Sequence, residues 1–76
     1  MQVDPDVGQR LAHFLVHGDL DTALDIVLYY TDQPGKPPDW FSVNRDFQRM
    51  FGLDNQTSRL LITYIRHNKD ILYDKR

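Results

Sequence analysis

The sequence contains no cysteine, so neither disulfide bonds nor a thiolate zinc site can stabilise its 76 residues. A chain of this length is near the lower limit at which one apolar core is sufficient for folding. No apolar run approaches the roughly 20 residues that a membrane-spanning helix needs, and the first residues, MQVDPDVG, have no basic or apolar leader segment. We therefore expect a single soluble, cytoplasmic domain with no membrane partner.

The sequence also has little of what catalysis requires. It has no glycine-rich phosphate loop and no cysteine nucleophile, and its serines, Ser42 and Ser58, have the positions of a helix cap and a core-facing residue. His13 and His17 have a spacing that can hold zinc, but two ligands do not make a site, and HFLVH lacks the glutamate of a metalloprotease. We predict no enzyme, no catalytic or metal-binding residue, no cofactor and no small-molecule substrate.

Apolar residues and an uneven charge distribution are what the chain does have. Hydrophobic residues make up 41% of the sequence and aromatic residues 12%, which is too much for a disordered segment. The net charge is −2, but residues 1–44 carry two basic against seven acidic side chains, whereas residues 45–76 carry seven basic against four acidic ones. We expect the two halves to meet different partners.

Two helices are predicted in residues 1–31, where they would form an acidic hairpin. The first begins at Pro5 with Asp4 as its cap and ends before Gly18, and the second runs from Leu20 to Thr31 with Asp19 as its cap. An acidic ridge, which is either a solvated face or a site for a basic partner, is formed on the second helix by Asp21, Asp25 and Asp32. Residues 32–40 are predicted to be a proline-rich loop, after which Trp40 folds back onto the core.

Residues 41–76 are predicted to contain two further helices. The third is capped by Asp39 or Ser42 and ends at Gly52, with an apolar stripe of Val43, Phe47, Met50 and Phe51. The fourth runs from Asn55 to about His67, with Asp54 as its cap and an inward stripe of Ser58, Leu61, Ile62 and Ile65.

The fourth helix is also apolar on a second flank, where Leu60 and Tyr64 project. This flank must be covered by the C-terminal segment, by the first two helices or by a second copy of the chain. Asn68 is a candidate for left-handed backbone, and the residues after it form either an extra helical turn or a short strand. The predicted fold is therefore a small all-α, four-helix domain.

Residues 43–66 resemble the helix-turn-helix of DNA-binding regulators over about a third of the chain. Phe47, Phe51, Leu53 and Leu61 have the positions of its internal apolar contacts, and Gly52 lies at the turn. Gln48 and Ser58 depart from the pattern, because a small and an aliphatic residue are usual there. The resemblance implies DNA binding by side chains that read bases or neutralise phosphates, namely Asn44, Arg45, Arg49, Asn55, Gln56, Arg59, Thr63, Arg66 and Lys69.

Two alternatives remain open. Residues 43–66 also suit an ordinary helical hairpin. The chain also suits a protein-interaction module, such as a phage- or plasmid-type inhibitor or adaptor, or a homodimer. The interface residues predicted for that case are Leu60, Tyr64, Tyr73, Asp21 and Asp25. A recognition helix must leave Gln56, Arg59 and Thr63 exposed together. The most useful observation is therefore which face of the fourth helix is buried.

Overall fold

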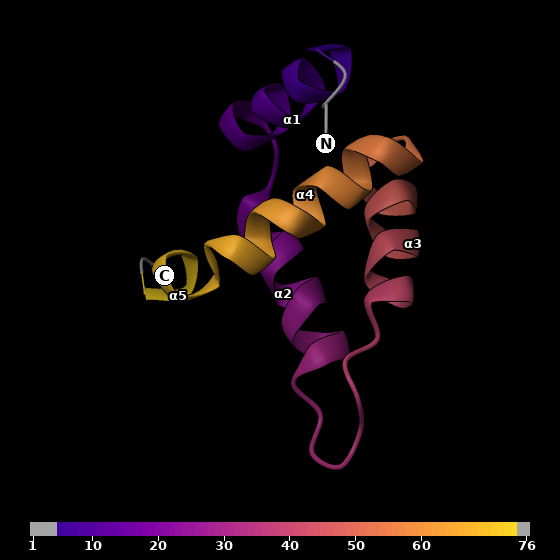
Figure 1. Ribbon diagram of the computed structural model, residues 1–76, viewed down its shortest axis with the longest axis vertical. Helices are drawn as coiled ribbons and strands as arrows, with labels where there is room; N and C mark the ends of the chain where they lie inside the picture. The colour runs from indigo at the N-terminus through magenta and orange to yellow at the C-terminus, as the bar shows by residue number, and fades with distance from the viewer. Residues whose placement is uncertain (1–4, 75–76) are drawn as a thin grey trace.

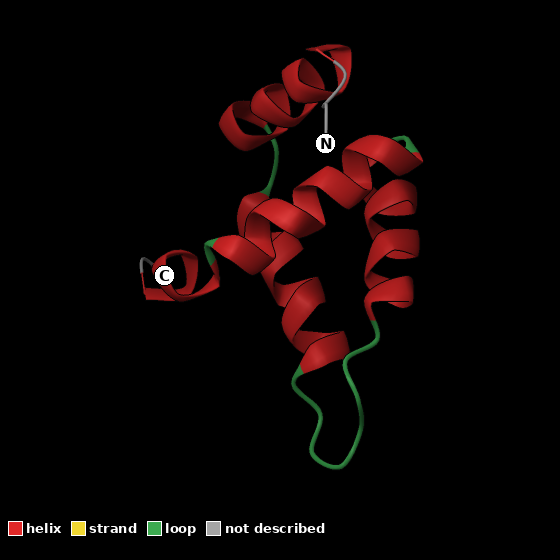
Figure 2. Cartoon of the chain, viewed as in Figure 1, coloured by secondary structure: helices red, strands yellow, loops and turns green. Residues whose placement is uncertain are grey.

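The computed structural model describes residues 5–74, and this range contains helices and loops but no strand (Figure 1, Figure 2). The helices are α1 (Pro5–His17), α2 (Leu20–Thr31), α3 (Trp40–Phe51), α4 (Asn55–His67) and α5 (Lys69–Asp74). The predicted all-α, four-helix domain is confirmed, and residues 69–74 add a short helix rather than a strand. The predicted cap Asp4 lies outside the described residues.

Local signals explain several helix ends. Asp19 caps α2 by accepting from the backbone N–H and the hydroxyl of Thr22. Asp39, rather than Ser42, caps α3, because its carboxylate accepts from the backbone N–H of Ser42 at 3.1 Å and from its hydroxyl at 2.6 Å. Gly52 ends α3 in the left-handed conformation with φ +65°.

Asn68 ends α4 in a different way from the prediction. Its φ is −118°, so the expectation of a left-handed residue is wrong. The side-chain amide of Asn68 donates to the carbonyl of Tyr64 at 2.9 Å, and its backbone N–H donates to the same carbonyl at 3.1 Å. These bonds satisfy the end of the helix without a left-handed turn.

The helices α2, α3 and α4 form a three-helix unit. In Figure 1, α2 and α3 extend from the loop of residues 32–39, and α4 crosses the end of the pair that is remote from this loop, with α1 on its other side. The first two helices pack little on each other, since α1 packs mainly on α4 and α2 on α3. Phe14 of α1 contacts Phe51 with ring centroids 4.9 Å apart, which holds α1 near the turn between α3 and α4.

The centre of the core lies within this three-helix unit. The apolar side chains that are at most 1% exposed come from α2 (Ala23, Leu24, Val27), α3 (Val43, Phe47) and α4 (Leu61, Ile65). Trp40 packs against this cluster, as predicted. Met50 is 60% exposed, so its predicted place in the core is wrong. It lies at the edge of the apolar stripe, whereas Phe51 in the same turn packs against the core.

The second flank of α4 is partly covered within the monomer. Leu60 and Tyr64 are half-buried, with Tyr64 packed against the core cluster, and α1 packs on α4. The hydroxyl of Tyr73 donates to the carbonyl of Leu24 at 3.1 Å and ties α5 to α2. Within residues 5–74, none of the helices has the length and apolar character that crossing a bilayer requires.

Candidate nucleic-acid interface

One side of α4 is open along the whole helix. Successive residues of an α-helix are rotated by about 100°, and the open side spans an arc of about that width. All five residues of this arc are exposed: Asn55, Gln56, Arg59, Thr63 and Arg66. On the opposite side Leu61 and Ile65 are completely buried. The base-reading residues predicted on this helix therefore share one face, which we call the open face of α4.

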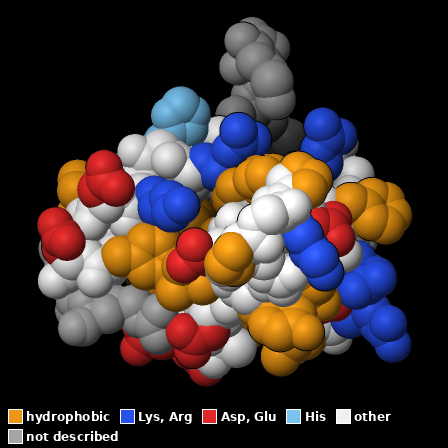
Figure 3. Space-filling view, turned by 90° about the horizontal axis from the view of Figure 1, so that it is seen from below, with side chains coloured by type: hydrophobic (Ala, Val, Ile, Leu, Met, Phe, Trp, Pro, Cys, Tyr) orange, Lys and Arg blue, Asp and Glu red, His pale blue; other side chains and the backbone are white. Residues whose placement is uncertain are grey.

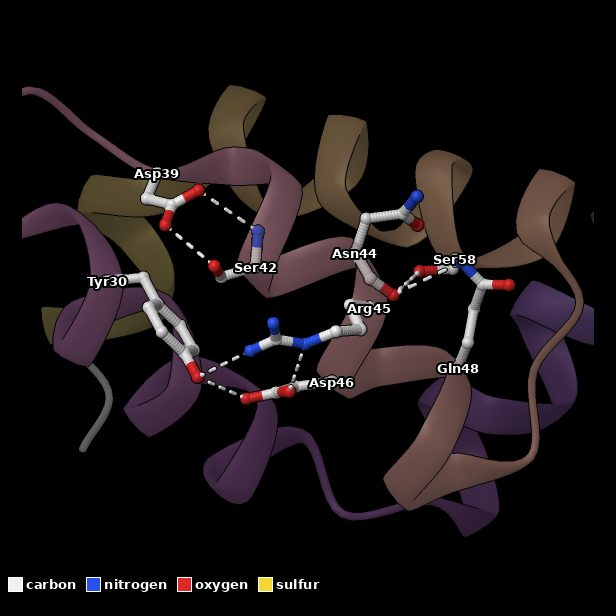
Figure 4. A network of polar contacts seen from close by, with 8 residues as sticks. All are labelled: Tyr30, Asp39, Ser42, Asn44, Arg45, Asp46, Gln48 and Ser58. Atoms are coloured by element: carbon white, nitrogen blue, oxygen red, sulfur yellow. Dashed lines mark hydrogen bonds and ion pairs between the residues drawn. The ribbon is translucent and has the colours of Figure 1, made fainter.

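The two departures from the helix-turn-helix pattern have polar partners in the structure. Ser58 is completely buried, and its hydroxyl donates to the carbonyl of Asn44 at 3.2 Å (Figure 4). The side-chain amide of Gln48 donates to the same carbonyl at 3.4 Å. Ser58 thus joins α4 to α3 by a hydrogen bond where an apolar contact is usual, whereas the bond of Gln48 lies within α3.

Asn44 joins the helices rather than standing open to a ligand. Its side-chain amide donates to Oδ1 of Asn55 at 3.0 Å, while its own Oδ1 is buried and has no hydrogen-bond partner. The half-buried amide of Asn44 would have to break this hydrogen bond to Asn55 before it could bind a base edge. Asn44 therefore orients Asn55 at the start of the open face.

Arg45 belongs to a polar network that joins α3 to α2 (Figure 4). Its Nε donates to the carboxylate of Asp46 at 3.3 Å, and its Nη2 donates to the hydroxyl of Tyr30 at 3.4 Å. The Tyr30 hydroxyl donates to the same carboxylate at 2.7 Å, which raises the pKa of Tyr30 because the bond favours the protonated phenol. Since Asp46 balances part of its charge, Arg45 is a weaker phosphate contact than an unpaired arginine.

The other predicted phosphate contacts differ in their surroundings. Within residues 5–74 the ion pairs involve Arg10 with Asp54 and Arg45 with Asp46, so neither Arg49 nor Arg59 is engaged in one. The guanidinium of Arg66 lies 4.9 Å from the centre of the Trp40 ring, a cation–π contact that orients it. Lys69 is exposed at the start of α5, beyond the end of α4.

Charge is unevenly distributed over the surface. In Figure 3 the basic side chains gather on the right and upper parts of the view, and the acidic side chains lie mostly on the left and lower parts. The right side of this view is the side on which α3 lies in Figure 1. An anionic partner would therefore approach α3 and the adjoining end of α4 most favourably.

The residues predicted for a protein interface do not form one open surface. Leu60, Tyr64 and Tyr73 are half-buried, and only Asp21 and Asp25, both on α2, are exposed. The large apolar side chains that are most exposed in the described part of the chain are instead Val16, Tyr29, Phe41, Met50 and Ile71.

The two histidines of α1 pack on each other, with ring centroids 4.6 Å apart. They line an open cavity of about 850 Å³ between α1 and the turn from α3 to α4, where Phe14 and Phe51 also lie. In residues 5–74 no three histidine, cysteine or carboxylate side chains gather as a metal would require. The geometry therefore offers no third ligand to this pair.

Phe41 was missed by the sequence analysis. It is 79% exposed and, with Asn44, Arg45, Gln48 and Arg49, lines a groove of about 260 Å³ on α3. The signal was available, because Phe41, Arg45 and Arg49 follow each other at intervals of four residues on the side of α3 away from the core.

No family model, no curated protein sequence and no solved structure matches this chain. Its function must therefore be inferred from its own residues.

Proposed function

We propose that the chain is a small, non-enzymatic DNA-binding regulator that places α4 in the major groove of DNA. The observation that carries the proposal is that Gln56, Arg59 and Thr63 are exposed together on one side of α4. The major groove is about 12 Å wide and admits one α-helix. A helix whose opposite side is fixed in the core by Leu61 and Ile65 presents its polar side chains in a set orientation.

Each side chain of the open face has a chemical role in this proposal. The amide of Gln56 suits an adenine edge, and the guanidinium of Arg59 suits the two acceptors of guanine. The hydroxyl of Thr63 donates to the carbonyl of Arg59 at 3.0 Å, so its methyl group is the part available to a thymine methyl. Arg49 and Arg66 neutralise phosphates on either side of the helix.

Titration of a fluorescent mixed-sequence duplex, followed by anisotropy at low and moderate salt, tests the proposal. We expect binding that weakens as salt rises, because phosphate contacts release counterions. Arg59→Gln should weaken binding by about tenfold, within the ~1–3 kcal/mol of one bidentate base contact. Lys36→Gln, the same charge change in the exposed loop between α2 and α3, is the matched control and should have little effect. Absence of binding even at low salt would show that the proposal is wrong.

A protein-interaction module, acting as an inhibitor, an adaptor or a homodimer, is the second candidate. It is favoured by the five large apolar side chains that are more than half exposed: Val16, Tyr29, Phe41, Met50 and Ile71. Sedimentation velocity over a range of concentrations tests the homodimer. A monomer at every concentration would contradict self-association, whereas a concentration-dependent shift to a larger species would support it.

A further inference from the structure

The side chain of Phe41 is exposed without a structural reason. It is 79% exposed, the highest value among the large apolar residues of the described chain, and it lies on the side of α3 opposite Val43 and Phe47, which are completely buried. The ring therefore contributes nothing to the core. Its apolar surface remains in contact with water, which is unfavourable. Such a ring is suited to contact with another molecule.

The neighbours of Phe41 define the chemistry of that contact. Arg45 and Arg49 follow it at intervals of four residues on the same side of α3, so each step along the helix is about 6 Å. The three side chains line one groove of about 260 Å³. One aromatic face and two guanidinium groups therefore stand in line on a single rigid helix.

This groove adjoins the open face of α4. Asn44 is part of the groove lining, and its amide donates to Asn55 at the start of α4 at 3.0 Å. Ser58 in the next turn of α4 donates to the carbonyl of Asn44 at 3.2 Å. A nucleic acid bound to the open face is therefore within reach of the groove.

Charge complementarity favours a nucleic acid over an apolar protein surface as the occupant. An apolar partner covering Phe41 would also desolvate the adjacent guanidinium groups, and Arg49 has no ion pair within residues 5–74 to offset that cost. A nucleotide can both cover Phe41 and bind the guanidinium groups, because its base offers an aromatic face and its phosphates offer hydrogen-bond acceptors. Asp46 balances only part of the charge of Arg45.

We propose that Phe41 stacks on an unpaired base next to the duplex bound by α4, while Arg45 and Arg49 contact the phosphates of that strand. The inference rests on the proposed DNA binding and extends it to a substrate class, namely duplex DNA that adjoins a single-stranded segment. A fully paired duplex presents no free base face to an exposed side chain of this kind, whereas a single-stranded tail does.

The test compares one duplex with and without a mixed-sequence single-stranded tail, placed at either the 5′ or the 3′ end. The wild-type protein should bind the better tailed duplex about tenfold or more tightly than the blunt one, since stacking of one base is worth ~1–3 kcal/mol. Phe41→Ala should lose this gain and keep the affinity for the blunt duplex. Met50→Ala, which removes an exposed apolar side chain from the same helix outside the groove, is the matched control and should keep the gain.

Two further measurements separate stacking from other effects. Thermal unfolding of Phe41→Ala should match that of the wild type, because the side chain is exposed. The salt dependence of binding to the tailed duplex should be unchanged in Phe41→Ala, but its slope should fall by about one contact in Arg49→Gln.

The outcomes distinguish this inference from the proposed function. If the wild type binds the blunt duplex and the tail adds nothing, or if Phe41→Ala keeps the gain, the stacking role is wrong and the proposed function stands. If the wild type binds neither duplex at low salt, the proposed function itself is wrong. Binding that requires the tail would support the role of Phe41 and would contradict the placement of α4 in the major groove.

Discussion

The three-helix unit of α2, α3 and α4 differs from α1 in how completely its apolar residues are covered. The unit contributes seven core side chains that are at most 1% exposed, whereas the best-buried residues of α1, Val7 and Phe14, are 6% and 7% exposed. Leu11 and Leu15 of α1 are only partly buried against the core. Helix α1 therefore packs on α4 with less complete burial, whereas α3 packs on α4 and α2 packs on α3 within the fully buried core.

The two sides of α4 depend on different parts of the chain. The orientation of the open face depends on the contacts of α4 with α3 and with the core. Helix α1 packs elsewhere on α4 and leaves the open face exposed. Changes in the three-helix unit should therefore affect both stability and binding, and changes in α1 should affect stability more than the geometry of the open face.

The largest effect is expected from Leu61→Ala in the three-helix unit, compared with Leu11→Ala in α1. Leu61 is completely buried, so its truncation should lower the free energy of unfolding by ~2–5 kcal/mol. Because a domain of this size rarely has more than ~3–5 kcal/mol of stability, much of the variant should be unfolded. Leu11 is partly exposed, and the same truncation there should cost roughly 1–2 kcal/mol. Urea denaturation followed by circular dichroism measures both values, and equal losses would contradict the distinction between the three-helix unit and α1.

A smaller effect is expected at the junction between α1 and α2. A Cβ atom at Gly18 would lie 2.5 Å from a ring carbon of Phe14 and 2.6 Å from its carbonyl oxygen, so one of these groups must move. We expect Gly18→Ala to destabilise the protein by ~1–3 kcal/mol, as overpacking does, and to loosen α1 from α4. Hydrogen exchange measured along α1 and α4 would locate the change.

Gly8→Ala is the matched control for that substitution. Gly8 lies inside α1, and a Cβ atom there would meet no atom within 4 Å. Alanine favours a helix interior over glycine by ~0.5–1 kcal/mol, so this variant should be slightly more stable than the wild type. If both variants had the same effect, the close approach of Phe14 to Gly18 would not limit the side chain at position 18.

Much of the fold could be predicted from the sequence because its determinants are local. The carboxylates of Asp19 and Asp39 bond to residues three positions later, and the left-handed Gly52 needs no distant partner. The start of α2 and both ends of α3 could therefore be predicted from the sequence. The packing of α1 on α4 rather than on α2 depends on contacts between distant residues, such as Phe14 with Phe51. Local sequence signals could not predict it.

The candidate site could be predicted only in part for the same reason. Helical periodicity places Gln56, Arg59 and Thr63 on one side of a helix, and that grouping is found. Periodicity does not show whether a neighbouring helix covers a given side of a helix. It therefore misplaced Met50, and it aligned Phe41 with Arg45 and Arg49 without showing that Phe41 is exposed. The bonds of Arg45 to Asp46 and Tyr30 depend on how α2 meets α3, which no local pattern encodes.

The smallest effect concerns acid stability of the three-helix unit, in which Asp19 and Asp39 cap α2 and α3. The pKa of Asp39 is lowered by the hydroxyl of Ser42 and then by its backbone N–H, and the pKa of Asp19 is lowered by the corresponding groups of Thr22. A carboxylate whose pKa is lower in the folded state adds stability above its unfolded value of about 3.9, and this stability is lost as pH falls through the lowered pKa. Asparagine caps a helix about as well as aspartate but does not titrate in this range. The double variant Asp19→Asn/Asp39→Asn should therefore lose less stability than the wild type as pH falls below about 4. Urea midpoints of both proteins, measured from neutral pH downward, test this expectation. If the midpoints fall equally with pH in the two proteins, these caps do not make the stability of the three-helix unit depend on pH.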